Sequence, residues 1–564
     1  MKTTLAQQAA IDSNAARIVC SAGPGSGKTE VLVQRIRRLI AAGTEPRRIV
    51  AITFTNAAAR EIEERLATKD LGEAMQREDP RLGYIGTLHG FALRILREFG
   101  RSLGYGERVS VISPESAEAL LAEKARSLGC KEPIKKLLAI KAGGDSVASL
   151  PKIVVDSFLC DLRDAGLVDF DILLEEAAKL CELYPEAVGA RYEHLLVDEV
   201  QDSSPTDWRI YRALAIRNKF FVGDSDQAIY GFRGGAVQEM VRESTEPGTE
   251  LILLSENFRS RPEICAIAQR LIEHNANRIP KPLISVSGPG GRILSPPNAS
   301  NEGEEIAIVS REIQAQIALG ADPNEIAVIG RTNAIVEAFS KTLAACHIPV
   351  RRRVLPNLPK DFKVGRAIVE FMAEPENNSL AFLYLVAAGR TAREARSIVQ
   401  RAEIAGCSVN KLEHLVPPYS TAAGAARVLF DLDCSREMIM LATERLKDLP
   451  ADASPADLAL VLAAPEETAK EEGEGVHCLT IHGAKGREFD AVFIVGLEDE
   501  TIPGNRAGAD IEEERRLLYV AITRARAFVG LSYCRSRVSA WGAILGRKAS
   551  RFLGEIGLAN VPKT

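Results

Sequence analysis

The chain contains no C-x-x-C pair, although it has ten cysteines among its 564 residues. A zinc ribbon or an iron–sulfur clasp is therefore not expected, and scattered thiols are typical of a cytoplasmic protein. No signal peptide and no apolar run of membrane-spanning length is apparent, so no contact with a membrane is expected. The chain also lacks an excess of basic residues, because its net charge is −5. A globally basic nucleic-acid binder is excluded, and any nucleic-acid path must be a local groove.

A glycine-rich segment lies between an apolar run, residues 16–22, and a helix-like sequence that begins at Glu30. Glycines in such a loop let backbone N–H groups turn inward around phosphate oxygens, and the following helix adds its partial positive charge. Lys28 would reach the β- and γ-phosphates, and the Thr29 hydroxyl would ligate Mg²⁺. The alternative is a glycine-rich turn with a solvated lysine. The strand–loop–helix order favours a site for ATP and Mg²⁺, with the nucleotide-binding residues Ala22, Gly23, Pro24, Gly25, Ser26, Gly27, Lys28 and Thr29.

A second short apolar run, residues 195–197, ends in paired carboxylates at Asp198 and Glu199. The run is too short for a helix and is typical of a buried parallel strand. At the carboxyl end of such a strand, Asp198 would hold Mg²⁺ together with Thr29, and Glu199 would polarise the attacking water. Acidic residues after a strand are more often a solvated turn. The glycine loop upstream in the same chain favours the catalytic interpretation.

Further segments accompany these two motifs from residue 7 to residue 526, in an order that chance does not explain. Together they resemble the UvrD/Rep/PcrA helicases of superfamily 1. The segments that carry the resemblance are Gln7–Ile11, Ile52–Ala59, Gly86–Phe91, Asp169–Asp171, Val197–Asp202, Val222–Gly234, Glu256–Ser260, Leu479–Phe489 and Glu513–Ala525.

The resemblance implies that distant parts of the chain complete the ATP site. Arg259 and Arg524 correspond to two arginine fingers, and a planar guanidinium suits charge spread over phosphoryl oxygens. Gln227 corresponds to a sensor that contacts the γ-phosphate and couples it to the DNA groove. With Lys28 and Glu199, these residues form the predicted catalytic set. An arginine such as Arg259 is otherwise more often a surface or capping residue, so its assignment rests on the resemblance.

The resemblance also implies a pocket for the base and sugar of the nucleotide. Gln7 corresponds to a glutamine that reads the adenine edge, since an amide offers a donor and an acceptor side by side. Glu488 corresponds to a contact of the nucleotide sugar. Phe258 stands where the family usually has tyrosine beside the base, so stacking is kept and a hydroxyl is lost.

A path for single-stranded DNA is implied by aromatic and polar residues of the same segments, because bases stack on aromatic side chains. Phe232 replaces the usual tryptophan and offers a smaller stacking face. A phenylalanine at the end of an apolar strand is usually a core residue, and for Phe54 this alternative stays open. The predicted DNA-binding residues are Phe54, Thr55, Asn56, Thr87, His89, Tyr230, Phe232, Arg233 and His482.

The fold class expected is α/β, with two RecA-like parallel-sheet motor domains of the P-loop NTPase fold, each carrying a mainly helical insertion. Apolar strands that end in motif loops support this, since open parallel sheets build sites at their carboxyl edges. Strands are expected at 18–22, 49–53, 194–197 and 220–222, then at 326–329, 476–480, 491–495 and 528–532. The expected limits are 1–90 and 191–258 for the first motor domain, 91–190 for its insertion, 259–372 and 475–564 for the second motor domain, and 373–474 for its reduced insertion.

The function implied is that of an ATP-dependent 3′–5′ DNA helicase and translocase, acting in DNA repair, replication or defence. Its expected ligands are ATP, Mg²⁺, single-stranded DNA and junctions of single- and double-stranded DNA. A protein partner, either a nuclease or a repair or defence factor, is a further expectation. The alternative is a UvrD-like nucleotide- and DNA-sensing ATPase subunit, for example of an anti-phage defence complex, that signals to a partner.

Overall fold

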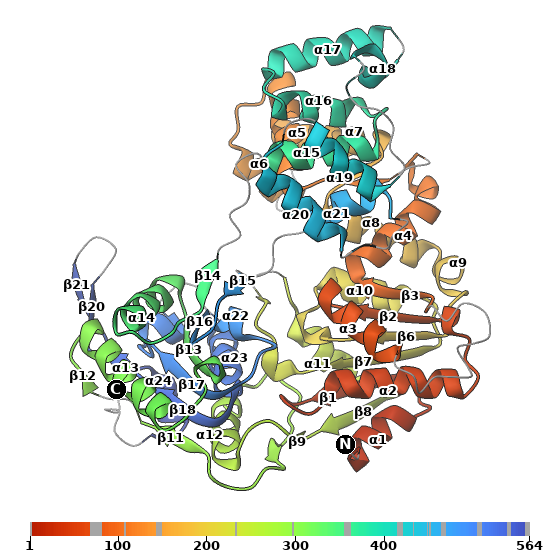
Figure 1. Cartoon of the computed structure of the whole chain (residues 1–564). Coiled ribbons are helices and arrows are strands. Elements are labelled where there is room, and N and C mark those ends of the chain that lie inside the picture. The colour runs from red at the N-terminus through yellow and green to blue at the C-terminus, as the bar shows by residue number, and fades with distance from the viewer. Residues whose placement is uncertain are drawn as a thin grey trace.

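The computed structural model shows two α/β lobes side by side and a helical lobe above them (Figure 1). The first lobe contains the N-terminus, and the second contains the C-terminal helix α24 (Arg551–Glu555). The structure describes residues 3–67, 82–106, 109–142, 149–231, 234–295, 298–354, 362–405, 407–413, 415, 421–431, 434–447, 449, 453–463, 470–504, 510–538 and 543–558.

The first lobe is built on a six-stranded parallel sheet with the strand order β3-β2-β6-β7-β1-β8. Its central strands are mostly apolar because both faces of the sheet are covered. In β1, Ile18 and Cys20 join the core on one face, and Val19 joins the core on the other. The strands are β1 (Arg17–Ala22), β2 (Ile49–Thr53), β3 (Tyr84–Thr87), β6 (His194–Val197), β7 (Asn218–Gly223) and β8 (Thr249–Leu254).

Helices cover both faces of this sheet and leave its carboxyl edge for the motif loops. One face is covered by α1 (Leu5–Asp12), α2 (Lys28–Ala41) and α3 (Asn56–Leu66). The other face is covered by α4 (Leu88–Phe99), α8 (Phe170–Leu183), α9 (Pro185–Gly189), α10 (Pro205–Ala213) and α11 (Val237–Thr245).

The second lobe repeats this plan with a five-stranded parallel sheet in the order β11-β18-β17-β13-β16. Its strands are β11 (Arg292–Leu294), β13 (Ile326–Gly330), β16 (His477–Thr480), β17 (Phe489–Val495) and β18 (Ala525–Leu531). One face packs on α12 (Pro262–Ile272), α22 (Ile481–Ala484), α23 (Ile511–Ile522) and α24. The other face packs on α13 (Glu302–Ala318) and α14 (Asn333–Ala345).

Other strands form two-stranded sheets that are separate from these two large sheets. A parallel pair joins β9 (Glu256–Asn257) to β10 (Ile284–Ser285), and another joins β12 (Asn298–Ala299) to β19 (Tyr533–Cys534). Antiparallel pairs join β14 (Arg352–Val354) to β15 (Lys470–Glu472), and β20 (Ser536–Val538) to β21 (Ile544–Gly546).

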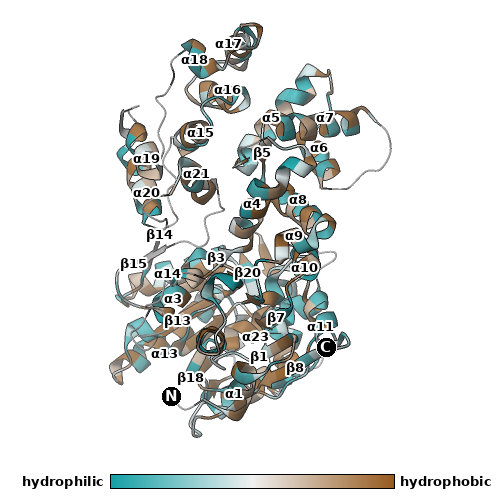
Figure 2. Ribbon diagram, turned by 90° about the vertical axis from the view of Figure 1, so that its right-hand side faces the viewer, coloured by the Kyte–Doolittle hydropathy of each residue, from teal (hydrophilic) through white to brown (hydrophobic). Residues whose placement is uncertain are grey.

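The helical lobe is assembled from both insertions, whose helices stand above the α/β lobes (Figure 2). The first insertion supplies α5 (Pro114–Ser127), α6 (Ile134–Lys141) and α7 (Leu150–Asp164), with the short parallel pair β4 (Ser110–Val111) and β5 (Leu167–Val168). The second supplies α15 (Phe362–Ala373), α16 (Asn378–Ala387), α17 (Ala392–Ile404), α18 (Val409–Glu413), α19 (Ala422–Asp431), α20 (Arg436–Leu446) and α21 (Pro455–Ala463). Residues of the two insertions, such as Phe158 and Phe371, belong to one continuous hydrophobic core.

The predicted fold class is confirmed, because two parallel α/β sheets each carry a mainly helical insertion. The domain limits stay predictions, and packing bears on two of them. Helices α4 and α8, inside the predicted insertion 91–190, pack on the first sheet. Helix α15 precedes the predicted limit at 373, yet it packs with the helical lobe. Among the described residues no helix has the length and apolarity needed to cross a membrane.

Candidate ATP site and nucleic-acid cleft

The glycine loop connects β1 to α2 and has the conformation that its sequence demands. Gly25 and Gly27 have φ values of +65° and +81°, in the left-handed region that glycine tolerates. A Cβ atom at Gly25 would lie 2.7 Å from the Cβ of Arg259, so the loop also needs glycine for space. Ser26 closes the loop by donating its hydroxyl to the carbonyl of Gly23 at 2.7 Å. Helix α2 then begins at Lys28, so its N-terminal N–H groups face the position of a phosphate.

Gln7 lies directly on this loop. Its Nε2 donates to the carbonyl of Ser26 at 2.9 Å, and its Oε1 accepts from the backbone N–H of Thr4 at 2.9 Å. Thr4 accepts in turn from the N–H of Gln7, which completes a capping box at the start of α1. The amide is therefore held beside the nucleotide loop, and its predicted contact with adenine stays a prediction.

The predicted carboxylate pair follows β6 and faces Lys28. The Nζ of Lys28 lies 3.5 Å from Oε1 of Glu199, and Oδ1 of Asp198 accepts from the Glu199 N–H at 2.9 Å. Glu199 has φ +50°, a strained value for a residue with a side chain. Burial and the neighbouring Glu199 raise the pKa of Asp198 to about 7. Burial also opposes ionisation of Glu199, but Lys28 and Lys485 lower its pKa to about 2.

These residues fit Mg²⁺ bound with a nucleotide. A buried carboxylate, Asp198, and a half-buried one, Glu199, lie beside one lysine, and a hard cation with oxygen ligands would balance their negative charge. Thr29, in the first turn of α2, and Asp198, at the end of β6, would hold the metal. The loop N–H groups and Lys28 would hold the phosphates.

Arg524, a finger predicted from the second half of the chain, contacts the predicted sensor Gln227 of the first lobe. Arg524 is 2% exposed and donates from Nη2 to Oε1 of Gln227 at 3.0 Å. The Gln227 side chain is anchored on its other side, because its Nε2 donates to Oδ2 of Asp224 at 2.6 Å. Burial and the nearby Arg259 lower the pKa of Arg524 to about 9. Among the described residues, the hydrogen-bond acceptors of Arg524 are neutral oxygens. Its buried guanidinium is therefore suited to binding an anion.

The predicted finger Arg259 and the predicted sugar contact Glu488 are paired with each other. The Nε of Arg259 lies 2.6 Å from Oε2 of Glu488, and its Nη1 donates to the Thr523 carbonyl at 3.2 Å. Glu488 is shared with Arg526, whose Nη2 lies 2.8 Å from Oε1. Phe258, just before the finger, donates its N–H to the carbonyl of Gly25 at 3.0 Å. The segment with these predicted residues therefore touches the glycine loop directly.

Three functional candidates were missed by the sequence reasoning, although all lie inside segments that it singled out. Asn257 donates to the Pro24 carbonyl at 2.7 Å and accepts from the N–H of Arg259 at 2.9 Å. Gln201 donates to Glu199 and accepts from the N–H of Asp224 at 2.9 Å. The third, Lys485, pairs with Asp202, donates to the Gln227 carbonyl at 3.2 Å and lies 4.6 Å from the Tyr230 ring centroid. The available signal was a polar side chain inside a segment that the resemblance had already identified.

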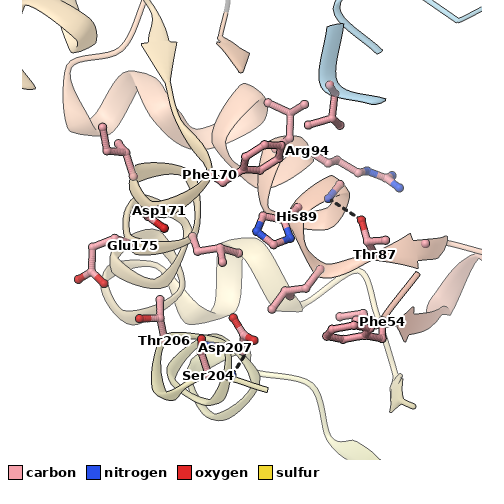
Figure 3. A pocket seen from close by; sticks show the side chains of 18 of the residues that line it. Phe54, Thr87, His89, Arg94, Phe170, Asp171, Glu175, Ser204, Thr206 and Asp207 are labelled. Carbon is pink, nitrogen blue, oxygen red and sulfur yellow. Dashed lines mark hydrogen bonds between the residues drawn. The ribbon is translucent and has the colours of Figure 1, made fainter. Parts of the chain in front are cut away.

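A cleft of about 2240 Å³ opens between the first lobe and the helical lobe. It is lined by the predicted DNA-binding residues Phe54, Thr55, Asn56, Thr87, His89 and Tyr230. Figure 3 shows Phe54 and Thr87 toward one side of it and the acidic Asp171 and Glu175 toward the other. Arg60, Arg94 and Arg97 also line the cleft, together with acidic side chains such as Asp202 and Asp207, so its lining carries charges of both signs.

Three rings from both lobes form a continuous array at this cleft. Phe54 and Tyr230 stack with centroids 5.4 Å apart and planes at 20°. His482 of the second lobe lies 6.0 Å from the Tyr230 ring and approaches the Ile229 carbonyl at 3.3 Å. Phe54 is therefore partly exposed at the lobe interface and is not a core residue. Phe232 and Arg233, predicted to lie beside this array, fall outside the described residues.

Threonines of three motifs cap helices that begin near the array. Thr55, Thr87 and Thr480 accept from the N–H of the residue three positions on, at the starts of α3, α4 and α22. The sequences T-L-H-G at 87–90 and T-I-H-G at 480–483 place this cap equivalently in the two lobes. Asn56 is the first residue of α3.

His89 is half-buried in the cleft wall. It packs edge-on against Phe170 with the ring centroids 5.2 Å apart (Figure 3). Burial lowers its pKa to about 4, although Asp171 opposes the shift. The resemblance predicted that His89 lies near the DNA strand. In the structure its side chain forms part of the wall of the cleft.

Comparison with known protein families decides which family has this arrangement. The model of the UvrD/REP helicase N-terminal domain matches residues 3–247, and that of the UvrD-like helicase C-terminal domain matches residues 252–353 and 439–536. The chain belongs to the UvrD/REP helicase family. The first match contains Lys28, Glu199 and Gln227, and the second contains Arg259 and Arg524. The ATP site of this family member is thus predicted to join its two matched regions.

Individual relatives align over almost the whole chain. The ATP-dependent DNA helicase UvrD1 of Mycobacterium tuberculosis is 30% identical, over 98% of this chain and 84% of its own length. The ATP-dependent DNA helicase PcrA of Leuconostoc citreum is 29% identical over the same shares. DNA helicase II of Escherichia coli is 28% identical, over 98% of this chain and 86% of its own length.

Proposed function

We propose that this chain is an ATP-dependent DNA helicase that couples ATP hydrolysis to 3′–5′ movement along single-stranded DNA and to unwinding of the duplex. Its family membership supports the helicase activity, and its relatives carry the name of ATP-dependent DNA helicases. Polarity rests on the placement of the predicted strand contacts on the two α/β lobes, as the resemblance implies.

The residues of the ATP site divide the work of hydrolysis. Lys28 and the loop N–H groups would bind the phosphates, and Thr29 and Asp198 would hold Mg²⁺, which would neutralise negative charge that develops on the phosphates. Glu199, kept ionised by Lys28 and Lys485, orients and polarises the attacking water. Arg524 and Arg259 donate to the phosphoryl oxygens. Arg259 must first exchange its ion pair with Glu488 for the nucleotide.

One observation carries the link between ATP and DNA. Gln227 ends the short 3₁₀ helix η5 (Ser225–Gln227) and contacts Arg524, and three residues later Tyr230 stacks on Phe54 in the cleft. Only two residues separate Gln227 from Tyr230, so a change in the contacts of Gln227 would also move the Tyr230 ring. These contacts support the proposal that one loop carries both the nucleotide sensor and the stacking platform.

The expected partners are single-stranded DNA and junctions of single- and double-stranded DNA, and a nuclease or a repair or defence factor is a candidate protein partner. We assign the chain to the cytoplasm. The scattered cysteines of the sequence, without a C-x-x-C pair, support that assignment.

The deciding experiment compares two partial duplexes, one with a 3′ single-stranded tail and one with a 5′ tail. We expect ATP-dependent displacement from the 3′-tailed duplex and an ATPase rate that rises strongly with oligo(dT). Displacement from the 5′-tailed duplex alone would refute the polarity. An ATPase that no single strand stimulates would instead favour the signalling subunit.

A further inference from the structure

A segment of the second lobe crosses to the first lobe and contacts the loop at residues 224–230, here called the sensor loop because it contains Gln227. This crossing segment, residues 273–283, leaves α12 and ends at β10. Its Ile279 is 3% exposed and belongs to the core of the first lobe. Conversely, Ile229 of the first lobe is fully buried in the core of the second. The hydrophobic core of each α/β lobe therefore contains one isoleucine from the other lobe. Both isoleucines lie next to η5.

The crossing segment carries two buried cations that bind two buried carboxylates of the sensor loop. Lys281 Nζ lies 2.7 Å from Oδ1 of Asp224 and 2.9 Å from Oδ2 of Asp226. Arg278 binds Asp226 through two hydrogen bonds of 2.8 Å each. The two aspartates are fully buried, and Lys281 and Arg278 are 5% and 8% exposed. Buried ion pairs add little net stability, so this cluster calls for another role.

A chain of hydrogen bonds connects this cluster to the predicted ATP site. Asp224, held by Lys281 on Oδ1, accepts from Gln227 Nε2 on Oδ2 at 2.6 Å. Gln227 in turn accepts from Arg524 at 3.0 Å. Lys281 also approaches the nucleotide loop, since a Cβ on Gly23 would lie 3.9 Å from its Cε. Four side chains thus form one line from the crossing segment to the predicted finger.

The other end of the crossing segment is fixed to α23, the helix just before Arg524. Asn275 Nδ2 donates to the Glu512 carbonyl at 2.9 Å, and the Ala276 N–H donates to Oε1 of Glu512 at 2.8 Å. Arg516 donates to the Asn277 carbonyl at 2.8 Å. The segment therefore joins the sensor loop of one lobe to the finger helix of the other.

We propose that Lys281, supported by Arg278, is a positioning residue that sets the orientation of Gln227 through Asp224 and thereby determines DNA-stimulated ATP turnover. This inference rests on the proposed function. Each residue acts on the ATP site through the carboxylates of the sensor loop. Without Lys281, Asp224 loses the cation that fixes its carboxylate plane. Misplacement by about 1 Å at a reacting centre costs up to about 100-fold in rate.

The test measures ATP turnover of Lys281→Met at saturating oligo(dT). We expect a fall in kcat of about 10- to 100-fold with an unchanged KM for ATP, because the nucleotide loop itself is intact. Lys281→Arg keeps the charge and should recover most of the rate. The double variant Lys281→Met, Asp226→Asn removes one charge of each sign and so keeps the buried cluster balanced. Its kcat should stay low, because Asp224 still lacks its cation.

A matched control is Arg537, which forms a similarly buried cluster with Glu305 and Glu498. Arg537→Met should lower the melting temperature and leave the stimulated kcat unchanged. Wild-type kcat in Lys281→Met, or its return in the balanced double variant, would overturn the proposal and leave the cluster a structural one. A wild type without DNA stimulation would refute the proposed function instead, and the same variants would then be compared on the rate without DNA.

Discussion

At the scale of the residue, Glu199 combines three unusual properties. It has a left-handed backbone, its pKa is lowered by two lysines, and it lies beside an aspartate whose pKa is raised. Pairs of carboxyl groups with divergent pKa values are typical of sites in which the two groups have different roles. Asp198 is suited to the metal and Glu199 to the water.

The first prediction separates these roles. Glu199→Gln should retain Mg·ATP binding and lose about 10²- to 10⁴-fold in hydrolysis, because only the base is removed. Lys28→Ala should lose binding and turnover together. A fluorescent ATP analogue measures binding, and phosphate release measures turnover. Near wild-type turnover in Glu199→Gln would show that another group activates the water.

A second prediction concerns the fingers. Removing an arginine finger typically costs about 10³- to 10⁵-fold in turnover, so Arg524→Ala and Arg259→Ala should each lose most activity and keep DNA binding. Arg551→Ala, which breaks an exposed pair with Asp499, is the control and should retain activity. If both finger variants turn over ATP like the control, the site is not completed by the second lobe.

Residue roles were predictable from sequence where one local segment suffices. The glycine loop and Glu199 are readable because a strand, a turn and a helix start determine their geometry. Lys281 and Asn257 were not, since their partners are remote in sequence; Asn257 and Pro24 are 233 positions apart. No periodicity or local spacing encodes such a contact.

At the scale of the element, the central strands of both sheets were predicted, whereas among the edge strands only β16 was. The strands β2, β6 and β13 are apolar along their length because helices cover both of their faces. The strand β8 lies at an edge, with Leu251 41% exposed and Glu250 also exposed. Its first two residues are polar, and its apolar run, residues 251–254, is a signal that the sequence analysis left unused. The short strands β3 and β11 also lie at edges.

The third prediction concerns the aromatic array that joins two elements of the first lobe. Tyr230→Ala and Phe54→Ala should each weaken oligo(dT) binding by about 1–3 kcal/mol, the usual contribution of one base–aromatic stack. Tyr230→Phe keeps the ring and should bind like wild type. Fluorescence anisotropy with labelled oligo(dT) measures the affinity. Equal affinity of wild type and both alanine variants would exclude this array from the strand path.

At the scale of the whole molecule, the two insertions behave as one structural body in spite of their separation in the sequence. They share one hydrophobic core, and Glu370 of α15 bridges them. Glu370 accepts from the Ser113 N–H at 3.1 Å and from the Ser116 hydroxyl at 2.8 Å. Burial raises the pKa of Glu370, although Arg366 opposes the shift. Removing residues 373–474 would therefore expose the apolar side of α5 and α7.

The last prediction tests this joint body without deleting any of it. Glu370→Ala leaves a buried N–H and a buried hydroxyl without their acceptor, which costs about 1–3 kcal/mol. Because the core is shared, hydrogen exchange should accelerate in α5 and α16 alike, by about 5- to 150-fold if both open in one unit. Ser408→Ala is the matched control, since its bond to Glu376 lies within the second insertion. It should accelerate exchange around α18 and leave α5 unchanged. Acceleration in α16 without α5 after Glu370→Ala would mean that the insertions open separately, and that only the α/β lobes transmit the ATP cycle between them.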